Sequence, residues 1–363
     1  MKLLFVSPFF FLSFFVYQGT AQTTNVVVLD SAEMGRVKEV IATDPSAKIL
    51  YDSIVSEAEI HLRQDSRSLR TLHYEGLLDT NPDRIDTQKS LDRLLGITDI
   101  IYASYGSSDD RYADKARQLI LDWASTYEPT GNTINENKFC PLLWGYYLFK
   151  NHFSSDEQQK VEQWMKTIAQ KQMDRPHTPN NNWQAKRMKM VGMVGCITDN
   201  QPMKDFSLAG LKEYINTAYY ADSTSQDLMQ RDALHYHVSG LEPLLDAFIN
   251  LSKFDPAFDL YAYQSPAGAS VEKSVAYVLP FATGERTRQE WVNSKVALDH
   301  QRAAAGIEKY QPGKLFDPAQ ALPLFAWARY YNADWYELLN KRASSPGYAV
   351  TWVGLLNSSL VRN

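Results

Sequence analysis

The stretch Asp110–Thr126, DRYADKARQLILDWAST, decides the fold. Charged residues fill most of the positions between its apolar ones, which recur every three or four residues: Tyr112, Ala116, Leu119, Ile120 and Trp123. This spacing puts the apolar side chains on one stripe of a helix, with the polar residues on the other side. The stretch therefore predicts an α-helix over 110–126 that packs one face against a core.

The same pattern recurs on both sides of this stretch. Pro45 can open a helix that runs to about Leu62, and Ser155 is expected to cap another, with acidic residues in its first turn. Apolar residues at helical spacing predict further helices over 183–197, 205–220, 241–253, 270–282, 318–331 and 333–342. The last apolar stretch, Tyr348–Leu356, fits either a strand or a short helix.

Successive helices without a heptad repeat favour pairs of antiparallel helices, and such pairs can close into a ring. The expected fold class is all-α, an incomplete (α/α) toroid, and an irregular helical bundle is the alternative. No low-complexity linker divides the chain, so one domain over residues 22–363 is expected.

Composition excludes several classes of protein. A hydrophobic fraction of 44% over 363 residues excludes a disordered chain, and a net charge of −5 argues against a general nucleic-acid binder. Two cysteines are too few for a disulfide scaffold, a zinc ribbon or an iron–sulfur protein. Cys140 and Cys196 can either form a disulfide or stay as separate buried thiols, and the sequence leaves both open.

The N-terminus has the pattern of a signal peptide. Lys2 precedes an apolar stretch, Leu3–Tyr17, and the small residues of Gly19–Ala21 follow. We expect cleavage after Ala21, so that residues 1–21 are removed and the protein is periplasmic or secreted. No later run approaches the ~20 apolar residues that a membrane-spanning helix needs, so no membrane insertion is expected.

The segment Pro179–Trp183, PNNNW, carries three successive amides just before a predicted helix. On that helix Asn182, Lys186 and Lys189 share one face, and Arg187 lies beside it. A helix N-terminus with amides and cations suits a carboxylate ligand. The alternative is an N-cap followed by a solvated basic face.

The segment Arg231–His237, RDALHYH, places one Arg, one Tyr and two His within seven residues. If the segment is extended, Arg231, His235 and His237 point the same way; if it is helical, Arg231 and His235 share a face beside Tyr236. The alternative is that these are buried polar side chains with satisfied hydrogen bonds. An H-x-H pair can bind a metal, but no further ligand motif accompanies it, so neither a metal nor a cofactor is expected.

The residues that follow have the spacing of a capping box. Ser239 and Glu242 can cap each other's backbone, and Pro243 is tolerated in a first helical turn. This predicts a helix that begins at Ser239.

Two other loops carry polar side chains. Residues 72–76, LHYEG, include Tyr74, and residues 129–138, PTGNTINENK, include Asn135 and Lys138. The cations of 284–295 and 300–302 are interpreted as solvated surface. No dinucleotide-binding, P-loop, zinc-protease or serine-hydrolase motif is present.

Four segments resemble the alginate-lyase superfamily of polysaccharide lyases: 129–138, 181–192, 230–245 and 284–306. The resemblance runs from about Ile49 to Arg329, and RDALHYH with the following LEPL is its most specific part. It implies an (α/α) toroid that cleaves uronate polysaccharides by β-elimination.

By position, the resemblance implies catalytic roles for five residues: Asn181, Asn182, Arg231, His235 and Tyr236. Amides and Arg would neutralise the uronate carboxylate, and Tyr236, helped by nearby cations and by His235 or His237, would move the protons. Many members of the family have Asn-Asn-His where this chain has only Asn. Substrate contacts are expected from His237, Lys186, Arg187, Lys138, Asn135, Tyr74 and Trp183.

The expected function is therefore that of a lyase on an anionic polysaccharide, alginate or a glucuronan-like polymer, which leaves 4,5-unsaturated uronate ends. A glycoside hydrolase on the same toroid is one alternative, and its carboxylate pair would come from Asp232, Glu242, Glu75 or Glu136. An exported glycan-binding protein without activity is the other. The polymer, endo or exo action and the oligomeric state stay open.

Overall fold

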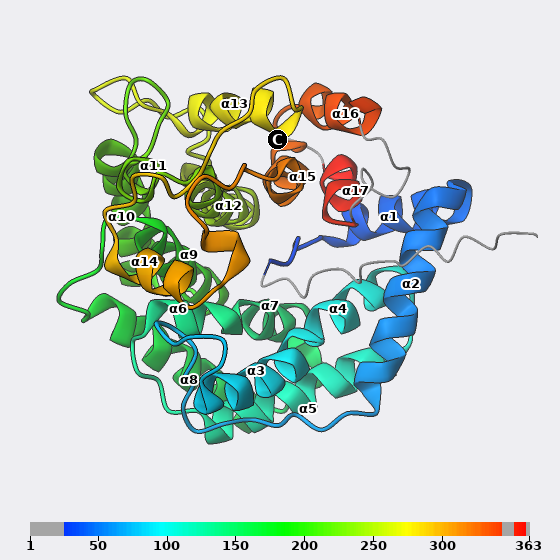
Figure 1. Cartoon of the computed structure of the whole chain (residues 1–363). Coiled ribbons are helices and arrows are strands. Elements are labelled where there is room, and N and C mark those ends of the chain that lie inside the picture. The colour runs from blue at the N-terminus through cyan, green and yellow to red at the C-terminus, as the bar shows by residue number, and fades with distance from the viewer. Residues whose placement is uncertain (1–24, 343–351, 361–363) are drawn as a thin grey trace, which may run out of the picture.

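The computed structural model describes residues 25–342 and 352–360. Helices lie around a centre into which the N-terminal segment runs (Figure 1). Within the described residues the only β pairing consists of three isolated bridges. The fold is an all-α (α/α) toroid, as the sequence predicts.

The first half of the ring runs from α1 to α9: α1 (Ser31–Thr43), α2 (Pro45–Leu62), α3 (Pro82–Leu95), α4 (Ile97–Gly106), α5 (Asp110–Thr126), α6 (Thr133–Glu136), η1 (Asn137–Phe139), α7 (Cys140–Leu148), η2 (Lys150–His152), α8 (Ser155–Met173) and α9 (Asn182–Ile197). The second half completes it: α10 (Gln201–Ala218), α11 (Gln226–Arg231), α12 (Leu234–Leu251), η3 (Pro256–Phe258), α13 (Val271–Ala282), α14 (Ala297–Ala304), η4 (Glu308–Tyr310), η5 (Pro318–Ala321), α15 (Leu322–Ala328), α16 (Ala333–Arg342) and α17 (Trp352–Ser359).

Local capping explains why several helices begin where they do. Asp44 accepts hydrogen bonds from the first turn of α2, and Pro45 takes a position that needs no N–H donor. The predicted bounds of α2 and α5 are confirmed to the residue. The cap of α8 is Ser154 and not Ser155, because Ser154 forms a capping box with Glu157.

The apolar stripe of α5 faces the core as predicted. All five of its residues are buried, and Trp123 is fully buried. They belong to one main cluster of buried apolar side chains that extends along the chain from Val26 to Leu356. At roughly 1.5–3 kcal/mol for a fully buried large apolar side chain, this burial is the main stabilising contribution.

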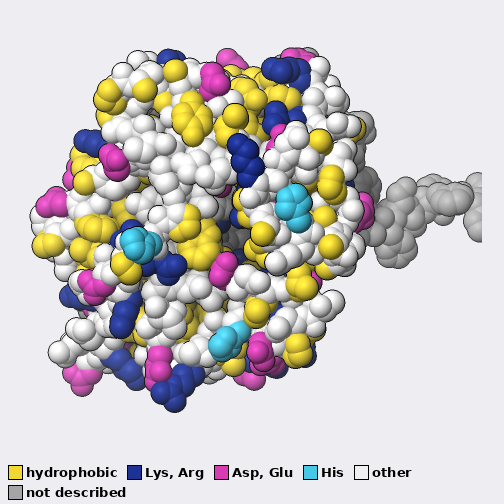
Figure 2. All heavy atoms as spheres, turned by 60° about the vertical axis from the view of Figure 1, so that its left-hand side comes forward, with side chains coloured by type: hydrophobic (Ala, Val, Ile, Leu, Met, Phe, Trp, Pro, Cys, Tyr) yellow, Lys and Arg dark blue, Asp and Glu magenta, His cyan; other side chains and the backbone are white. Residues whose placement is uncertain are grey.

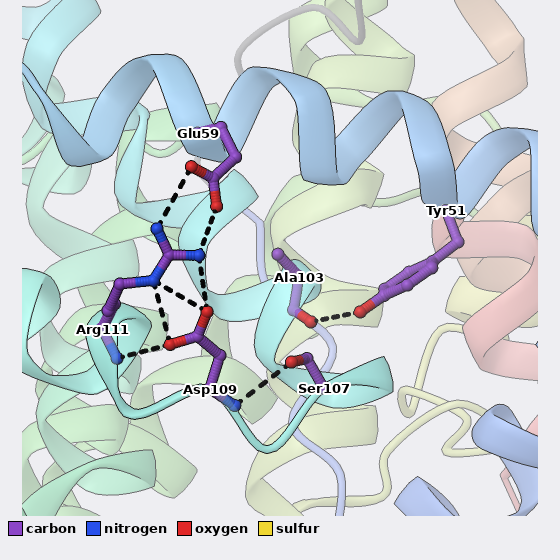
Figure 3. A network of polar contacts seen from close by, with 6 residues as sticks. All are labelled: Tyr51, Glu59, Ala103, Ser107, Asp109 and Arg111. Atoms are coloured by element: carbon purple, nitrogen blue, oxygen red, sulfur yellow. Dashed lines mark hydrogen bonds and ion pairs between the residues drawn. The ribbon is translucent and has the colours of Figure 1, made fainter.

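Polar contacts on the outside of the ring fix α2 against its neighbours (Figure 3). Arg111, at the start of α5, donates to Glu59 at 2.8 Å and to Asp109 at 2.7 Å. The Tyr51 hydroxyl donates to the carbonyl of Ala103 in α4 at 2.6 Å. The Arg111 pairs are exposed and contribute little to stability, so the buried core is what holds these helices together.

An extended segment, residues 25–29, runs to the centre of the toroid before α1 begins (Figure 1). Val26 and Val27 have no exposed surface. Asn250 of α12 accepts from the N–H of Val28 at 2.9 Å and donates to the carbonyl of Val26 at 2.8 Å. These bonds satisfy backbone groups that burial would otherwise leave without water.

The start of α12 differs from the prediction. The helix begins at Leu234, five residues before Ser239, and Pro243 lies inside it. The carboxylate of Glu290, distant in sequence, accepts the N–H of His235 at 2.8 Å and so replaces a local cap. The expected capping box at Ser239 was therefore wrong, because a remote carboxylate satisfies the helix start.

Other expectations have mixed outcomes. The predicted signal peptide, residues 1–21, lies outside the described residues, as does 348–351, while α17 shows that the following residues are helical. Both cysteines are free buried thiols, so the expected alternative without a disulfide holds. A search of the described helices finds none with the length and apolar character to cross a membrane.

Candidate functional site

The phenol of Tyr236 lies in the first turn of α12 between two guanidinium groups. Arg231 stacks on the ring, its central carbon 3.9 Å from the ring centre, and Arg302 donates to the hydroxyl at 3.3 Å. One cation thus covers a face of the ring and the other reaches its oxygen. The hydroxyl is therefore placed to exchange a proton with a bound molecule.

The backbone turns sharply between Arg231 and Tyr236, which brings them together. Arg231 ends α11, and Asp232 adopts a left-handed conformation with φ of 49° before α12 starts. The Asp232 carboxylate accepts from Arg288 at 2.7 Å and from the N–H of Asn293 at 3.0 Å. The segment is thus neither extended nor one helix, and both alternatives for 231–238 are corrected.

Neighbouring side chains hold the Tyr236 ring. Trp291 contacts it edge to face, with ring centres 5.6 Å apart, and His235 lies 5.2 Å away. Burial, and next Tyr236 itself, raise the pKa of Tyr310, so Tyr310 stays protonated beside it. Burial lowers the pKa of His235 to about 4, so this imidazole is neutral at pH 7.

Asn182 reaches the same helix one turn beyond Tyr236. Its side-chain amide donates to the hydroxyl of Ser239 at 3.2 Å, and its backbone N–H donates to Asp227 at 2.8 Å. Burial raises the pKa of Asp227 to about 6. The expected carboxylate site at the N-terminus of α9 is therefore occupied by the protein's own Asp227. The backbone of Asn182 binds this carboxylate, and its side chain contacts α12.

Two predicted site residues, Asn181 and Arg187, have structural roles. Asn181 caps α9 by accepting the N–H of Trp183 at 3.0 Å. Arg187 is 8% exposed and donates to the carbonyls of Gln172 at 2.7 Å and Met173 at 3.1 Å at the end of α8, so its expected substrate contact is not supported.

The ring of Trp183 faces Arg175, whose guanidinium carbon lies 5.2 Å from the ring centre. Arg175 lines a separate open hollow of about 420 Å³ together with Lys171 and His177. Among the described residues Trp183 makes no contact with Tyr236, so its ring lies beside Arg175 at this hollow and not beside the phenol.

His237 is fully buried and does not meet a substrate. Its Nε2 lies 3.1 Å from the carbonyl of Ser274, which can only accept, so Nε2 carries the proton. Its Nδ1 then accepts from the hydroxyl of Ser225 at 2.7 Å. Burial lowers the pKa of His237 to about 4. The expected substrate contact is corrected to a positioning role, which ties α12 to α11 and α13.

A polar cavity of about 140 Å³ lies next to Ser239. Its charged lining comes from Lys138, Lys186, Lys189 and Glu242. Of the predicted face of α9, Lys186 and Lys189 line this cavity and Asn182 does not, so these two basic residues are not simply solvated. Figure 2 shows that one face of the molecule is hollowed near its middle, with basic side chains at the edge.

Lys138 connects this cavity to the loop 72–76, because its ammonium lies 5.2 Å from the ring centre of Tyr74. Asn135 holds that loop: it donates to the carbonyl of Leu72 at 2.8 Å and accepts the N–H of Glu75 at 2.9 Å. Asn135 is therefore a positioning residue for Tyr74, and its expected substrate contact is replaced by contacts with the loop.

Two of the four carboxylates considered for a hydrolase, Glu136 and Asp232, are bound by groups of the protein itself. Glu136 is fully buried and accepts from the N–H groups of Thr130 and Gly131 and from Gln172. Asp232 binds Arg288, as described above. Across the described residues no group of three His, Cys, Asp or Glu side chains is placed to hold a metal.

Sequence reasoning missed Arg302, Tyr310 and Trp291, which surround Tyr236. Trp291 and Arg302 belong to the segments interpreted as solvated surface and Tyr310 follows them, and only the fold brings all three to Tyr236. The available signal was the resemblance of 284–306, which includes two of the three.

Comparisons with known proteins agree with the fold. A crystal structure of an alginate lyase from Bacteroides ovatus matches with a TM-score of 0.67 at 15% identity, covering 90% of this chain and 97% of that one. Alginate lyase A1-III from Sphingomonas species A1 matches with a TM-score of 0.50 at 14% identity, covering 81% and 95%. At these identities the two structures establish the fold alone. The comparison with curated proteins finds no match.

The family comparison carries the functional assignment. The family model named Alginate lyase matches residues 35–288, which is more than half of the chain and includes Asn182, Arg231 and Tyr236. The chain belongs to the alginate lyase family, and it is a polysaccharide lyase that acts on uronate polymers.

Proposed function

We propose that this lyase cleaves alginate or a glucuronan-like polymer with Tyr236 as both base and acid. The observation that carries the proposal is the position of the phenol between Arg231 and Arg302, one helical turn from the Ser239–Asn182 contact. Cations and an amide next to one phenol are what removal of a proton beside a carboxylate requires.

In the proposed step the Tyr236 phenolate takes the proton from C5 of a uronate. The amide of Asn182 and nearby cations stabilise the charge that develops on the carboxylate. The C5–H electron pair forms the C4–C5 double bond while the C4–O4 bond breaks, and O4 leaves with its electron pair. The phenol then returns its proton to O4. Because the C5 hydrogen and O4 lie on the same side of the sugar ring in a syn elimination, one residue can make both proton transfers.

The experiment is an ultraviolet-absorbance assay on a panel of uronate polymers. The wild-type enzyme should produce the conjugated-alkene signal on at least one of them, and Tyr236→Phe should lower kcat by ~10²–10⁴-fold. Tyr220→Phe, on an exposed tyrosine, is the matched control. A Tyr236→Phe enzyme with full activity would remove Tyr236 from the mechanism.

We also propose that the protein is exported to the periplasm or the medium. The support is the sequence alone: Lys2, the apolar stretch Leu3–Tyr17 and the small residues before Gln22. N-terminal sequencing of protein from fractionated cells tests this, with Gln22 expected as the first residue. An intact Met1 in the cytoplasmic fraction would contradict it.

A further inference from the structure

The polar cavity next to Ser239 contains charged groups that the protein itself does not pair. Lys189 is neutralised, because its ammonium lies 2.7 Å from Asp246 and both side chains are 1% exposed. Within 25–342 and 352–360, by contrast, the side chains of Lys186 and Glu242 make no ion pair or hydrogen bond, and the Lys138 ammonium lies over the Tyr74 ring. The Coulombic attraction between Lys186 and Glu242 acts across the cavity, without the direct hydrogen bonds that would compensate their burial.

The charges favour an anionic ligand with polar substituents. Two lysines and one glutamate leave the cavity with one excess positive charge when all three are ionised. Burial lowers the pKa of Lys186 to about 8 and raises the pKa of Glu242 to about 7. A carboxylate near the lysines would restore the charged form of Lys186, and a partly protonated Glu242 can donate to a hydroxyl or accept from one.

The cavity is closed on its inner side. Asn25 lines it, and the following residues, 26–29, fill the centre of the ring, where Val26 and Val27 have no exposed surface. Besides the bonds to Asn250, the carbonyl of Val27 accepts from the hydroxyl of Tyr105 at 2.7 Å. A polymer that enters past Tyr236 therefore meets packed backbone at Asn25.

The distance from Tyr236 to the closed side is short. Tyr236, Ser239 and Glu242 follow one another along α12, and six residues of helix at ~1.5 Å each place Glu242 ~9 Å beyond Tyr236. The cavity volume of about 140 Å³ is also below the ~300–1,000 Å³ of sites that enclose drug-sized ligands. This space accommodates one or two sugar units beyond the phenol.

We infer that this cavity is the receptor for the end of the polysaccharide chain, with Lys186 and Lys138 around the carboxylate of the terminal uronate and Glu242 at its hydroxyls. The enzyme then acts exolytically and releases products of one or two units. This inference rests on the proposed function, because the cavity can fix the length of the released product only if the cleaved bond lies at Tyr236.

The first test follows product sizes on a polymer that the wild-type enzyme degrades. Unsaturated mono- or disaccharide should be the earliest product, and viscosity should fall slowly. At equal mass of polymer the rate should be inversely proportional to chain length, because longer chains offer fewer ends. A ladder of longer oligosaccharides with an early fall in viscosity overturns the inference but leaves the proposed function intact. Absence of any alkene signal on all polymers contradicts both.

The second test addresses the residues. Lys186→Met should raise KM at least tenfold, which corresponds to ~1.4 kcal/mol, with a smaller change in kcat. Lys186→Arg should recover most of that loss, since it keeps the charge. Lys89→Met, on an exposed lysine of α3, is the matched control and should leave KM unchanged. If Lys186→Met keeps the wild-type KM, Lys186 is not part of the receptor and the inference fails.

Discussion

The guanidinium of Arg231 lies 3.9 Å above the ring of Tyr236 and pairs at the same time with Asp299 at 2.5 Å. Asp299 is 2% exposed, so this pair is largely shielded from solvent. The planar guanidinium can therefore stack on the ring while its edge stays bound to the carboxylate. One side chain thus fixes the ring that we assign as the base.

Arg231→Lys tests the importance of this stack. A lysine keeps the charge but loses the planar contact with the ring and the forked geometry toward Asp299. We expect kcat to fall about tenfold, which corresponds to ~1.4 kcal/mol. Steady-state kinetics by alkene absorbance measure it. Arg286→Lys is the control, because Arg286 also covers an aromatic ring, that of Phe281 at 4.9 Å, but is exposed. Equal kcat in wild type and Arg231→Lys would mean that the stack is dispensable.

Asn182→Ala separates the amide from the helix cap. The backbone N–H that binds Asp227 stays in place, so α9 should still start normally, while the donor near Ser239 is lost. We expect kcat to fall by ~10²–10³-fold if the amide stabilises the developing oxyanion, with ~1 kcal/mol lost in stability. Asn180→Ala, which removes a contact with Thr217, should lose stability only. Equal activities of the two variants would contradict the assignment of Asn182.

His237 predicts how stability depends on pH. Its pKa falls from 6.5 in the unfolded chain to about 4 in the folded protein, so the unfolded state binds a proton first as pH decreases. The stabilising contribution of neutral His237 to the free energy of unfolding is complete above pH 6.5. It is lost as pH falls toward 4, by about 3 kcal/mol in total. Urea unfolding at several pH values measures this. His237→Gln should flatten the slope in this window, and His152→Gln, on an exposed side chain, should not. An unchanged slope in His237→Gln would exclude this account.

The buried pair of Lys189 and Asp246 predicts a large effect of removing one partner. Burial alone would lower the pKa of Lys189, but the Asp246 carboxylate raises it, so the ammonium stays charged. Lys189→Met leaves Asp246 uncompensated and should cost ~3–5 kcal/mol in the free energy of unfolding. Lys189→Met with Asp246→Leu should recover most of this, because both charges are then gone. Chemical denaturation compares the free energies of unfolding of the variants. A Lys189→Met protein as stable as wild type would contradict this prediction.

The fold was predictable where its determinants are local. The cap at Asp44, the proline at position 45 and the stripe of α5 are all within a few residues of the helices that they define. The start of α12 was not, because its cap is Glu290, 55 residues away in sequence. The position of Arg302 could not be predicted for the same reason. Its neighbours in sequence have the pattern of a solvated surface, and only tertiary packing brings it to Tyr236.

The candidate site shows a second limit. Asn181, Arg187 and His237 have residue types that suit substrate binding, but in the structure they satisfy backbone and side-chain groups of the protein. Residue type alone cannot distinguish a hydrogen-bonding side chain that binds another group of the protein from one that binds a ligand. Asn182, Arg231, His235 and Tyr236 do come together, because all of them lie on or against the short break between α11 and α12.

The segment 25–29 also bears on how the chain reaches its final structure. Asn250 binds Val26 across 224 residues of sequence, so the interior of the ring is not complete until nearly three quarters of the chain has folded around its own beginning. Contacts of such long range impose a large loop-closure cost before they stabilise anything. The final closure of the ring should therefore be the slow event of refolding, and activity should return only with it.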